Sequence, residues 1–352
     1  QVKEVVLPIP QMSFNLGVSD NISLEGFYQL RWRKSILDGC GTYWSISDVY
    51  NCSDEGVVIP AGPLGNLSDG EVFNGLNNPL GPFPAGITGV MKNAGNIEPS
   101  DSGQWGLASR FFVPALSTEF GLYWVNYHQR TPTISILLDS SPNTAFASGA
   151  NRMQYTWDWS AEDISVVGAS FSTSLAGWSL FGEVSHTKDL PTQLNGLDLL
   201  RGASAGAGPL GFIAALPRDQ GLLFTGYDLL DKTQAQVSTL KFFPRVMGAE
   251  SLQILGELAY QKWGSIGDPM NSRRYGRAFV YGQAMTDTLS CANTGNFVAD
   301  YCEAEGFATS SSWGYRAQAT WSYPGLFGPV NAKPRVFWSH DVSGYSGDAT
   351  FV

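Results

Sequence analysis

The stretch WGLASRFFVPALSTEFGLYWVNYH, residues 105 to 128, contains two runs of alternating apolar and polar residues on either side of a short segment with Pro114. Alternation with a period of two is typical of a β-strand that has one apolar and one polar face. Arg110 lies within the first run and Glu119 at the start of the second. The stretch therefore predicts a β-hairpin, and it raises the question of which solvent each face meets.

The same pattern recurs along the chain. Further hairpins are predicted at residues 14–33, 167–184, 232–260 and 313–340, which gives about ten strands in five hairpins. The predicted fold class is therefore all-β and antiparallel.

The connections between these strands differ strongly in length. The short connections are residues 20–21, 114–118, 174–177, 244–250 and 324–332, and the long, irregular ones are residues 34–103, 131–163, 188–231 and 264–311. Short and long connections alternate strictly, as in an outer-membrane β-barrel with short periplasmic turns and long extracellular loops. The alternative is a soluble β-sandwich or lipocalin-like barrel with its apolar face inside, but this fold leaves the asymmetry of the loops unexplained.

Composition agrees with a membrane environment. Charged residues make up 15% of the 352 residues and aromatic residues 13%, whereas soluble domains have about 25% charged residues. The net charge of -10 and the lack of long basic runs argue against nucleic acid as a partner.

The four cysteines form two local pairs, Cys40 with Cys52 and Cys291 with Cys302, and both pairs fall in long connections. Neither pair has CxxC spacing or a neighbouring histidine, so disulfides in an oxidising compartment are predicted rather than a zinc site. No metal and no cofactor are expected.

Charge on the lipid face of a barrel costs ~2–4 kcal/mol per Arg or Lys near the bilayer midplane. The charged residues of the alternating segments are therefore assigned to the lumen, as lining and selectivity residues: Glu25, Arg31, Arg33, Arg110, Glu183, Glu257 and Arg316. Apolar residues share this phase: Phe27, Phe112, Phe181, Leu255 and Phe337. Such a mixed lining suits a hydrophobic or amphipathic solute, and a lumen sealed by a plug would show the same mixture.

Aromatic residues are expected in girdles at the two membrane interfaces: Tyr28, Trp32, Trp124, Tyr127, Tyr260, Trp263, Trp313 and Trp321. In the strand that begins near Glu119 both phases are apolar, because Tyr123 and Val125 match Leu122 and Trp124. The wet face of this strand stays open at this point.

Two patterns could indicate chemistry. GASAG at residues 202–206 matches the G-x-S-x-G nucleophile motif, and Ser204, Asp228 and His340 follow the chain order of a hydrolase triad. A chain with 40 glycines produces such matches by chance, and the motif requires a turn between a strand and a helix, whereas a Gly/Ala-rich loop is predicted here. We therefore expect no enzyme activity, with an outer-membrane hydrolase as the weaker alternative.

The three histidines, His128, His186 and His340, each fall near the end of a predicted strand. His186 and His340 share the phase of the lipid-facing residues, so we expect headgroup-level positions and no metal site.

Four segments resemble a proteobacterial family of outer-membrane proteins known as domain of unknown function 1302. They are residues 24–45 (LEGFYQLRWRKSIL, then CGTYWS), 103–132, 161–186 and 334–346 (PRVFWSHDVSGYS). The resemblance implies outer-membrane channels or assembly platforms, linked to envelope partners, to RND-type exporters and to lipid or steroid metabolism. It also implies longer proteins, so residues 1–352 are expected to form one β-barrel domain that belongs to a barrel of more than ten strands.

The resulting hypothesis is a bacterial outer-membrane β-barrel that serves as a channel or as an export or uptake component for a hydrophobic or amphipathic solute. Its expected partners are the lipid bilayer, lipopolysaccharide, a periplasmic or lipoprotein partner and an inner-membrane RND-type transporter. A plugged scaffold barrel with partner-binding loops is the alternative.

Overall fold

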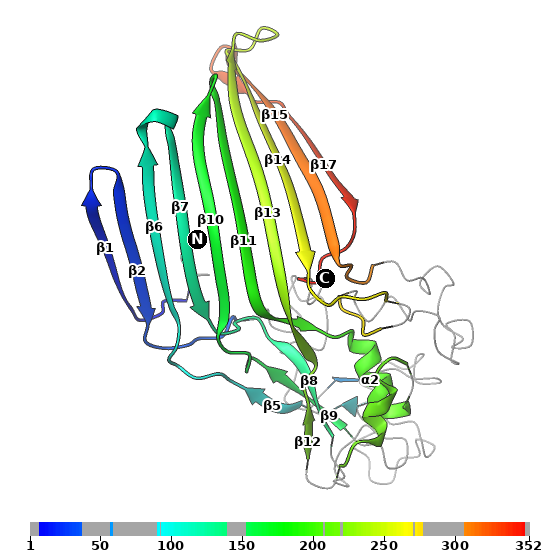
Figure 1. Cartoon of the computed structure of the whole chain (residues 1–352). Coiled ribbons are helices and arrows are strands. Elements are labelled where there is room, and N and C mark those ends of the chain that lie inside the picture. The colour runs from blue at the N-terminus through cyan, green and yellow to red at the C-terminus, as the bar shows by residue number, and fades with distance from the viewer. Residues whose placement is uncertain are drawn as a thin grey trace.

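The computed structural model describes residues 7–36, 57–58, 90–91, 93–138, 153–206, 208–218, 221–269, 272–276 and 306–348. Its main feature is a curved antiparallel sheet of eleven strands, laid out in nearly their order along the chain (Figure 1). The strands are β1 (Gln11–Ser19), β2 (Ile22–Gln29), β6 (Trp105–Val113), β7 (Thr118–Tyr127), β10 (Ile164–Leu175), β11 (Trp178–Gln193), β13 (Tyr227–Pro244), β14 (Ser251–Trp263), β15 (Ser311–Phe327), β16 (Val330–Ala332) and β17 (Arg335–Ser343).

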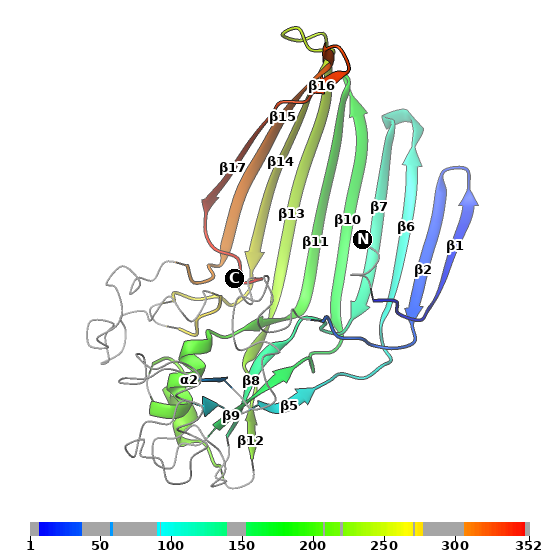
Figure 2. The same cartoon turned by 180° about the vertical axis from the view of Figure 1, so that it is seen from behind.

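All five predicted hairpins are present: β1–β2, β6–β7, β10–β11, β13–β14 and β15–β17. Their short turns lie at one end of the sheet, and the long connections leave from the other end (Figures 1 and 2). The β6–β7 turn is a single 3-10 turn, Pro114–Leu116, that ends at Ser117 in the left-handed region with φ of 48°. Pro114 begins this turn, where its fixed φ is compatible with helical geometry.

The described sheet is open. Within the described residues β1 pairs with β2 alone and β17 with β15 alone, so both outer strands have an unpaired edge. Closure into a barrel therefore stays a prediction.

The register divides the sheet into two faces. One row across neighbouring strands joins Arg110, Gly121, Ser170, Glu183 and Gln236. We call this side the polar face. The adjacent row on the opposite side, the apolar face, joins Leu24, Ser109, Leu122, Ala169, Val184, Ala235, Tyr260 and Trp313.

Large side chains on the apolar face are exposed, although they are hydrophobic. Leu122 is 53% exposed, Trp124 50% and Leu258 49%. A contiguous exposed apolar surface of this kind marks a membrane or protein contact in a folded chain.

The buried hydrophobic core lies elsewhere, in a cap at the end of the sheet where the long connections leave (Figure 1). The cap contains a four-stranded sheet in the order β12-β8-β9-β5, in which β5 runs parallel to β9. Its elements are β5 (Asn93–Ile97), β8 (Thr133–Leu138), β9 (Met153–Asp158), helix α2 (Gly196–Ala205), the 3-10 helix η4 (Gly211–Ala215) and β12 (Leu222–Phe224); the two-residue strands β3 (Val57–Val58) and β4 (Val90–Met91) pair with each other.

These elements correct the expectation that the long connections are irregular. Residues 133–138, TISILL, and 153–158, MQYTWD, form an antiparallel pair whose Ile136, Leu138, Met153 and Tyr155 are fully buried. They are short runs with few charges, which the sequence does not distinguish from apolar loop segments.

The cap also takes two of the predicted girdle residues. Trp32 is 8% exposed and Trp263 is 2% exposed, and both belong to the buried core. The Trp32 Nε1 donates a hydrogen bond of 2.9 Å to the Gln129 carbonyl. These two tryptophans therefore stabilise the cap, and their assignment to the membrane interface is wrong.

Buried polar side chains link the long strands to the cap. Gln193, near the end of β11, accepts a hydrogen bond of 2.6 Å from the Ile134 amide and donates one of 2.7 Å to the Gly226 carbonyl.

A buried ion pair stabilises the cap itself. Arg274 donates from Nε to the Asp198 carboxylate at 2.7 Å, and both side chains are almost fully buried. Removing one partner of such a pair costs ~3–5 kcal/mol, because the other charge stays buried without compensation.

A second contact joins the cap to the start of β13. The Tyr275 hydroxyl donates to Asp228 at 2.7 Å. Burial, followed by this hydrogen bond, raises the pKa of the Tyr275 hydroxyl, which favours the protonated form that donates to Asp228.

The four cysteines, and with them the two expected disulfides, lie outside the described residues. Within the described ranges, no helix has the length and apolar character that a membrane crossing requires.

We expect Gly226→Ala to destabilise the cap, because an added Cβ would lie 1.7 Å from the Ile134 carbonyl oxygen. Such overpacking costs ~1–3 kcal/mol or more. The matched control is Gly17→Ala in β1, where no atom lies within 4 Å of the added Cβ. Thermal unfolding and limited proteolysis of the detergent-solubilised proteins measure the difference, and equal stability of the two variants would contradict the packing described here.

Candidate functional site

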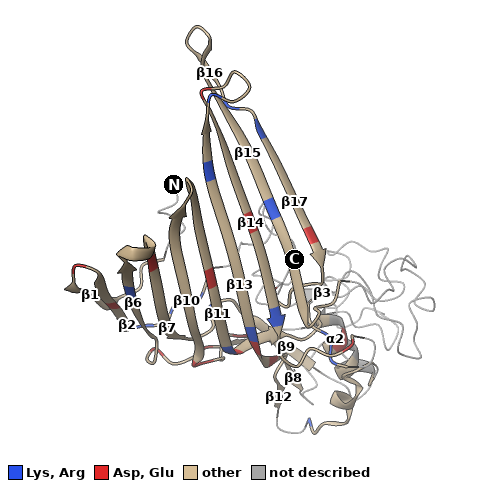
Figure 3. Cartoon of the chain, turned by 45° about the horizontal axis from the view of Figure 1, so that its top comes forward, with Lys and Arg blue, Asp and Glu red and all other residues tan. Residues whose placement is uncertain are grey.

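The polar face of the sheet is the candidate functional site, because it gathers the charged residues of strands that are distant in the sequence. The register places Glu25, Arg110, Glu183, Glu257 and Arg316 together on this face. In Figure 3 the charged residues of the sheet are isolated bands on otherwise uncharged strands. The shared phase of these five residues is confirmed, and their contact with a lumen stays a prediction.

Arg31 and Arg33 lie elsewhere. β2 ends at Gln29, and both arginines follow it in an exposed segment on either side of the buried Trp32. These two arginines are therefore not part of the sheet. The sequence did not reveal this, because its alternation continues beyond the end of the strand.

The structure assigns the two faces of β7. The sequence left them open, because both alternating sets of side chains in this strand are apolar. Tyr123 opposes Ala108 and Gly168 on the polar face, whereas Leu122 and Trp124 lie on the apolar face. The Tyr123 ring covers Gly168 so closely that a Cβ there would lie 2.2 Å from the ring. An aromatic ring laid over a glycine fills the space of a missing side chain, so Tyr123 is compatible with the polar face.

Glu119 also belongs to the polar face, and sequence reasoning did not include it among the site residues. It opposes Phe112 and Ser172. The sequence could not assign Glu119 to a face, because the two faces of β7 were not distinguished.

A hollow of about 250 Å³ lies on the polar face over β6, β7, β10, β11 and β13. Charged and small polar residues line it, including Arg110, Glu119, Ser170 and Glu183. Arg110 forms an ion pair with Glu25 at 3.7 Å, in which both side chains are partly exposed. An exposed pair of this kind contributes ~0–1 kcal/mol, so Arg110 can exchange partners at low cost.

A second hollow, of about 650 Å³, lies over β13, β14, β15 and β17 towards the cap. Its polar side chains include Gln234, Glu257, Gln261, Ser312, Arg316 and Asp341. Asp341 was missed by the sequence reasoning, although it alternates with His340 and shares the phase of Phe337. Its Oδ1 lies over Gly314, 2.9 Å from where a Cβ would be, which places the carboxylate inside the hollow.

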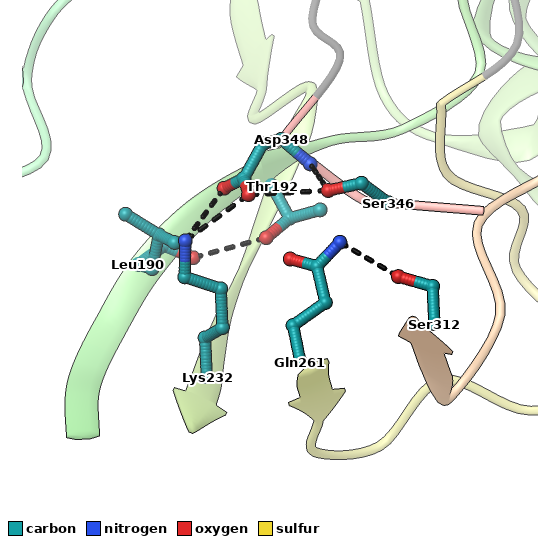
Figure 4. A network of polar contacts seen from close by, with 7 residues as sticks. All are labelled: Leu190, Thr192, Lys232, Gln261, Ser312, Ser346 and Asp348. Atoms are coloured by element: carbon teal, nitrogen blue, oxygen red, sulfur yellow. Dashed lines mark hydrogen bonds and ion pairs between the residues drawn. The ribbon is translucent and has the colours of Figure 1, made fainter. Parts of the chain in front are cut away.

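Residues 344–348, which we call the strap, close the cap end of this second hollow. After β17 the strap crosses the ends of β15 and β14 to reach β13, where Asp348 pairs with Lys232 at 3.0 Å (Figure 4). On the way, the Thr309 amide donates to the Tyr345 carbonyl at 3.0 Å. Figure 4 also shows Gln261 directed at Ser312, with a hydrogen bond of 2.7 Å. The strap therefore separates the hollow from the cap.

The polar face changes character towards the short turns. Five large apolar side chains lie there among polar ones such as Gln253, Gln318 and Thr320: Phe181, in the same row as Glu257 and Arg316, and Leu240, Phe242, Leu255 and Phe337 beyond that row. We call these five residues the inner apolar patch. Phe242 is 59% exposed and Phe337 58%.

The apolar face has polar or aromatic residues at both ends. At the short turns the Lys241 Nζ lies 4.9 Å from the Trp178 ring centroid and donates to the Ala176 carbonyl at 3.1 Å. At the cap end Trp124, Tyr260 and Trp313 are 40–50% exposed. A lysine that extends its stem over aromatic rings to reach a turn is typical of a membrane interface, and the sequence reasoning did not single out Lys241.

The residues of the hydrolase pattern lie in three different elements. Ser204 is in the last turn of α2 rather than in a turn between a strand and a helix, which corrects the predicted loop. Asp228 accepts hydrogen bonds from Arg273 and Tyr275 in the cap, and His340 packs against Tyr315 on the apolar face. This arrangement does not form the nucleophile elbow that the motif requires.

The histidines are likewise separate. His128 is buried and accepts a hydrogen bond at Nδ1 from the Asp163 amide, whereas His186 contacts Thr233 at 3.0 Å on the apolar face. Among the described residues, no group of three or more His, Cys, Asp or Glu side chains could hold a metal ion.

No curated protein and no solved structure matches the chain. The model of the family described as "Protein of unknown function (DUF1302)" matches residues 1–352, the whole chain. The chain therefore belongs to the DUF1302 family.

Proposed function

We propose that this chain forms a wall of an outer-membrane β-barrel that passes a hydrophobic or amphipathic solute. The observation that carries the proposal is the pairing of an exposed apolar face with a charged face on the same strands. A soluble sandwich would bury the apolar face against a second sheet. In the described residues the long sheet has no such cover, because the cap lies at its end (Figure 2).

The height of the apolar band supports the membrane assignment. Trp313 and Trp321 lie on the apolar face of β15, near the two ends of its pairing with β14, which runs from Ser311 to Ser322, and they are eight residues apart. Eight residues at ~3.3 Å each, tilted by about 40°, span ~20 Å. The lipid-facing band of outer-membrane barrels is about 25 Å tall, with aromatic residues at its borders.

Closure of the barrel follows from the cost of open edges. In hydrocarbon, each unsatisfied backbone group costs several kcal/mol, so open sheets do not span membranes. We therefore propose that the edges of β1 and β17 are paired in the membrane. In this arrangement the polar face lines the lumen, the short turns lie in the periplasm, and the cap faces outwards towards lipopolysaccharide.

A plugged scaffold barrel is the second candidate, and one observation favours it. Trp263 lies on the polar face by register, opposite Lys232, and is buried in the core of the cap. The cap thus packs against the cap end of the polar face, where a plug would be expected. A periplasmic or lipoprotein partner and an RND-type transporter fit either candidate.

Single-channel recording separates the two candidates. In planar bilayers containing the full-length protein we expect steady conductance, and we expect Arg110→Glu to shift the reversal potential in a salt gradient towards cation selectivity, because Arg110 shares its hollow with Glu119 and Glu183. Lys34→Gln, outside the sheet and paired with Glu98 at 2.7 Å, is the control and should leave selectivity nearly unchanged. Bilayers that stay silent at all voltages would favour the scaffold.

The membrane face is tested by neighbouring substitutions in β13. Val237 is 48% exposed on the apolar face, and Ser238 follows it on the polar face. We expect Val237→Arg to reduce the free energy of unfolding in lipid vesicles by ~2–4 kcal/mol, as for a lipid-facing arginine near the midplane. Ser238→Arg should cost much less. Denaturant titration of the vesicle-bound proteins measures both, and an equal loss for the two variants would refute the assignment of faces.

A further inference from the structure

Three charged side chains gather in the second hollow: Glu257, Arg316 and Asp341. Glu257 and Arg316 are direct cross-strand partners, and Asp341 lies on the neighbouring strand over Gly314, two residues from Arg316. In the part of the chain that the structure describes, no ion pair joins these three residues. The Glu257 carboxylate instead accepts a long hydrogen bond of 3.4 Å from Ser238. Each charge is therefore available to a ligand in the hollow.

The inner apolar patch begins immediately beside these charges. Leu255 lies two residues from Glu257 on the same face and opposes Leu240. Phe337 lies two residues from Ser339, which opposes Arg316. The patch extends from the charges towards the short turns, whereas Gln261 and Ser312 lie on the cap side. Between β13 and β14 the surface thus passes from the pair Gln234 and Gln261, through Ser238 and Glu257, to Leu240 and Leu255.

The signs of the charges select among amphiphiles. Arg316 supplies one positive charge, and Glu257 and Asp341 supply two negative charges. A purely anionic head group would meet two carboxylates, and a purely cationic one would meet the guanidinium. A head group that has both a phosphate and an ammonium group satisfies all three, because cross-strand neighbours lie about 5 Å apart and diagonal neighbours about 7–8 Å apart. Two carbons between phosphate and ammonium bring the two charges within this range.

We propose that the second hollow binds the zwitterionic head group of a phosphoethanolamine-type amphiphile, with its acyl chain on the inner apolar patch. Arg316 binds the phosphate, Glu257 and Asp341 bind the ammonium group, and the strap limits the site on the cap side. The chain then points towards the short turns. This inference rests on the proposed function, because the ligand must reach the polar face.

The test measures binding of two single-chain probes to the detergent-solubilised full chain by native mass spectrometry. The probes are lysophosphatidylethanolamine and lysophosphatidylglycerol with the same acyl chain, which differ in the ammonium group. We expect the unaltered protein to prefer the first probe by about tenfold, as for one charge-assisted hydrogen bond. Arg316→Gln should weaken both probes by about tenfold, because both contain the phosphate.

Neutralising the carboxylates should abolish the preference. Glu257→Gln combined with Asp341→Asn is expected to weaken the ethanolamine probe by about tenfold and to leave the glycerol probe unchanged or tighter. Arg335→Gln, on the same face but outside the hollow, should bind as the unaltered protein does. Thermal unfolding checks that each variant is folded, and Glu257→Gln alone replaces the double variant if the latter unfolds.

Equal binding of the two probes by the unaltered protein would overturn the inference, as would a preference that survives removal of both carboxylates. These results are independent of the conductance measurement. A silent bilayer together with the expected head-group preference would refute the channel and keep the site. Conductance without any head-group preference would keep the channel and refute the site.

Discussion

The alternation of side chains along a β-strand is the constraint on which the rest of this structure depends. Successive side chains point to opposite faces, so one sequence pattern creates two surfaces at once. Along ten long strands the register keeps Glu25, Arg110, Glu183, Glu257 and Arg316 on one side. A shift of one residue in β11 would place Glu183, and one in β15 would place Arg316, among Leu, Val and Trp side chains. The charge of the polar face and the exposure of the apolar face therefore have a common origin.

The cap has the opposite organisation. There, hydrophobic residues are inside, as in a soluble domain, and polar side chains such as Gln193 and Asp198 are buried with hydrogen-bond partners. It is assembled from segments that are distant in the sequence. They lie before β6, around β9, after β11 and after β14. Because β13 and β14 contribute Leu230 and Trp263 to this core, and the segment after β2 contributes Trp32, the cap fixes the strands at one end. The other end has only short turns.

The two hollows follow from how the register combines large and small residues. Gly121, Ser170 and Ser238 leave space between Arg110, Glu183 and Glu257 on neighbouring strands. None of these residues is adjacent in sequence to the others, and only the pairing of strands brings them together. The same pairing places Asp341 beside Arg316 and gives the second hollow its mixed charge.

The sequence by itself determined the five hairpins, the positions of the short turns and the common phase of Glu25, Arg110, Glu183, Glu257 and Arg316, because these depend only on local alternation and turn residues. It did not determine the end of β2, so it placed Arg31 and Arg33 in a strand that ends at Gln29. It also did not reveal the cap, whose strands are short and whose partners lie far along the chain. The tertiary structure alone decided which side chains of residues 119–128 share the polar face. Both phases of β7 are apolar, and only pairing with β6 and β10 places Tyr123 over Gly168 on the polar face. Hydrogen bonding between strands, which no single segment encodes, made that choice.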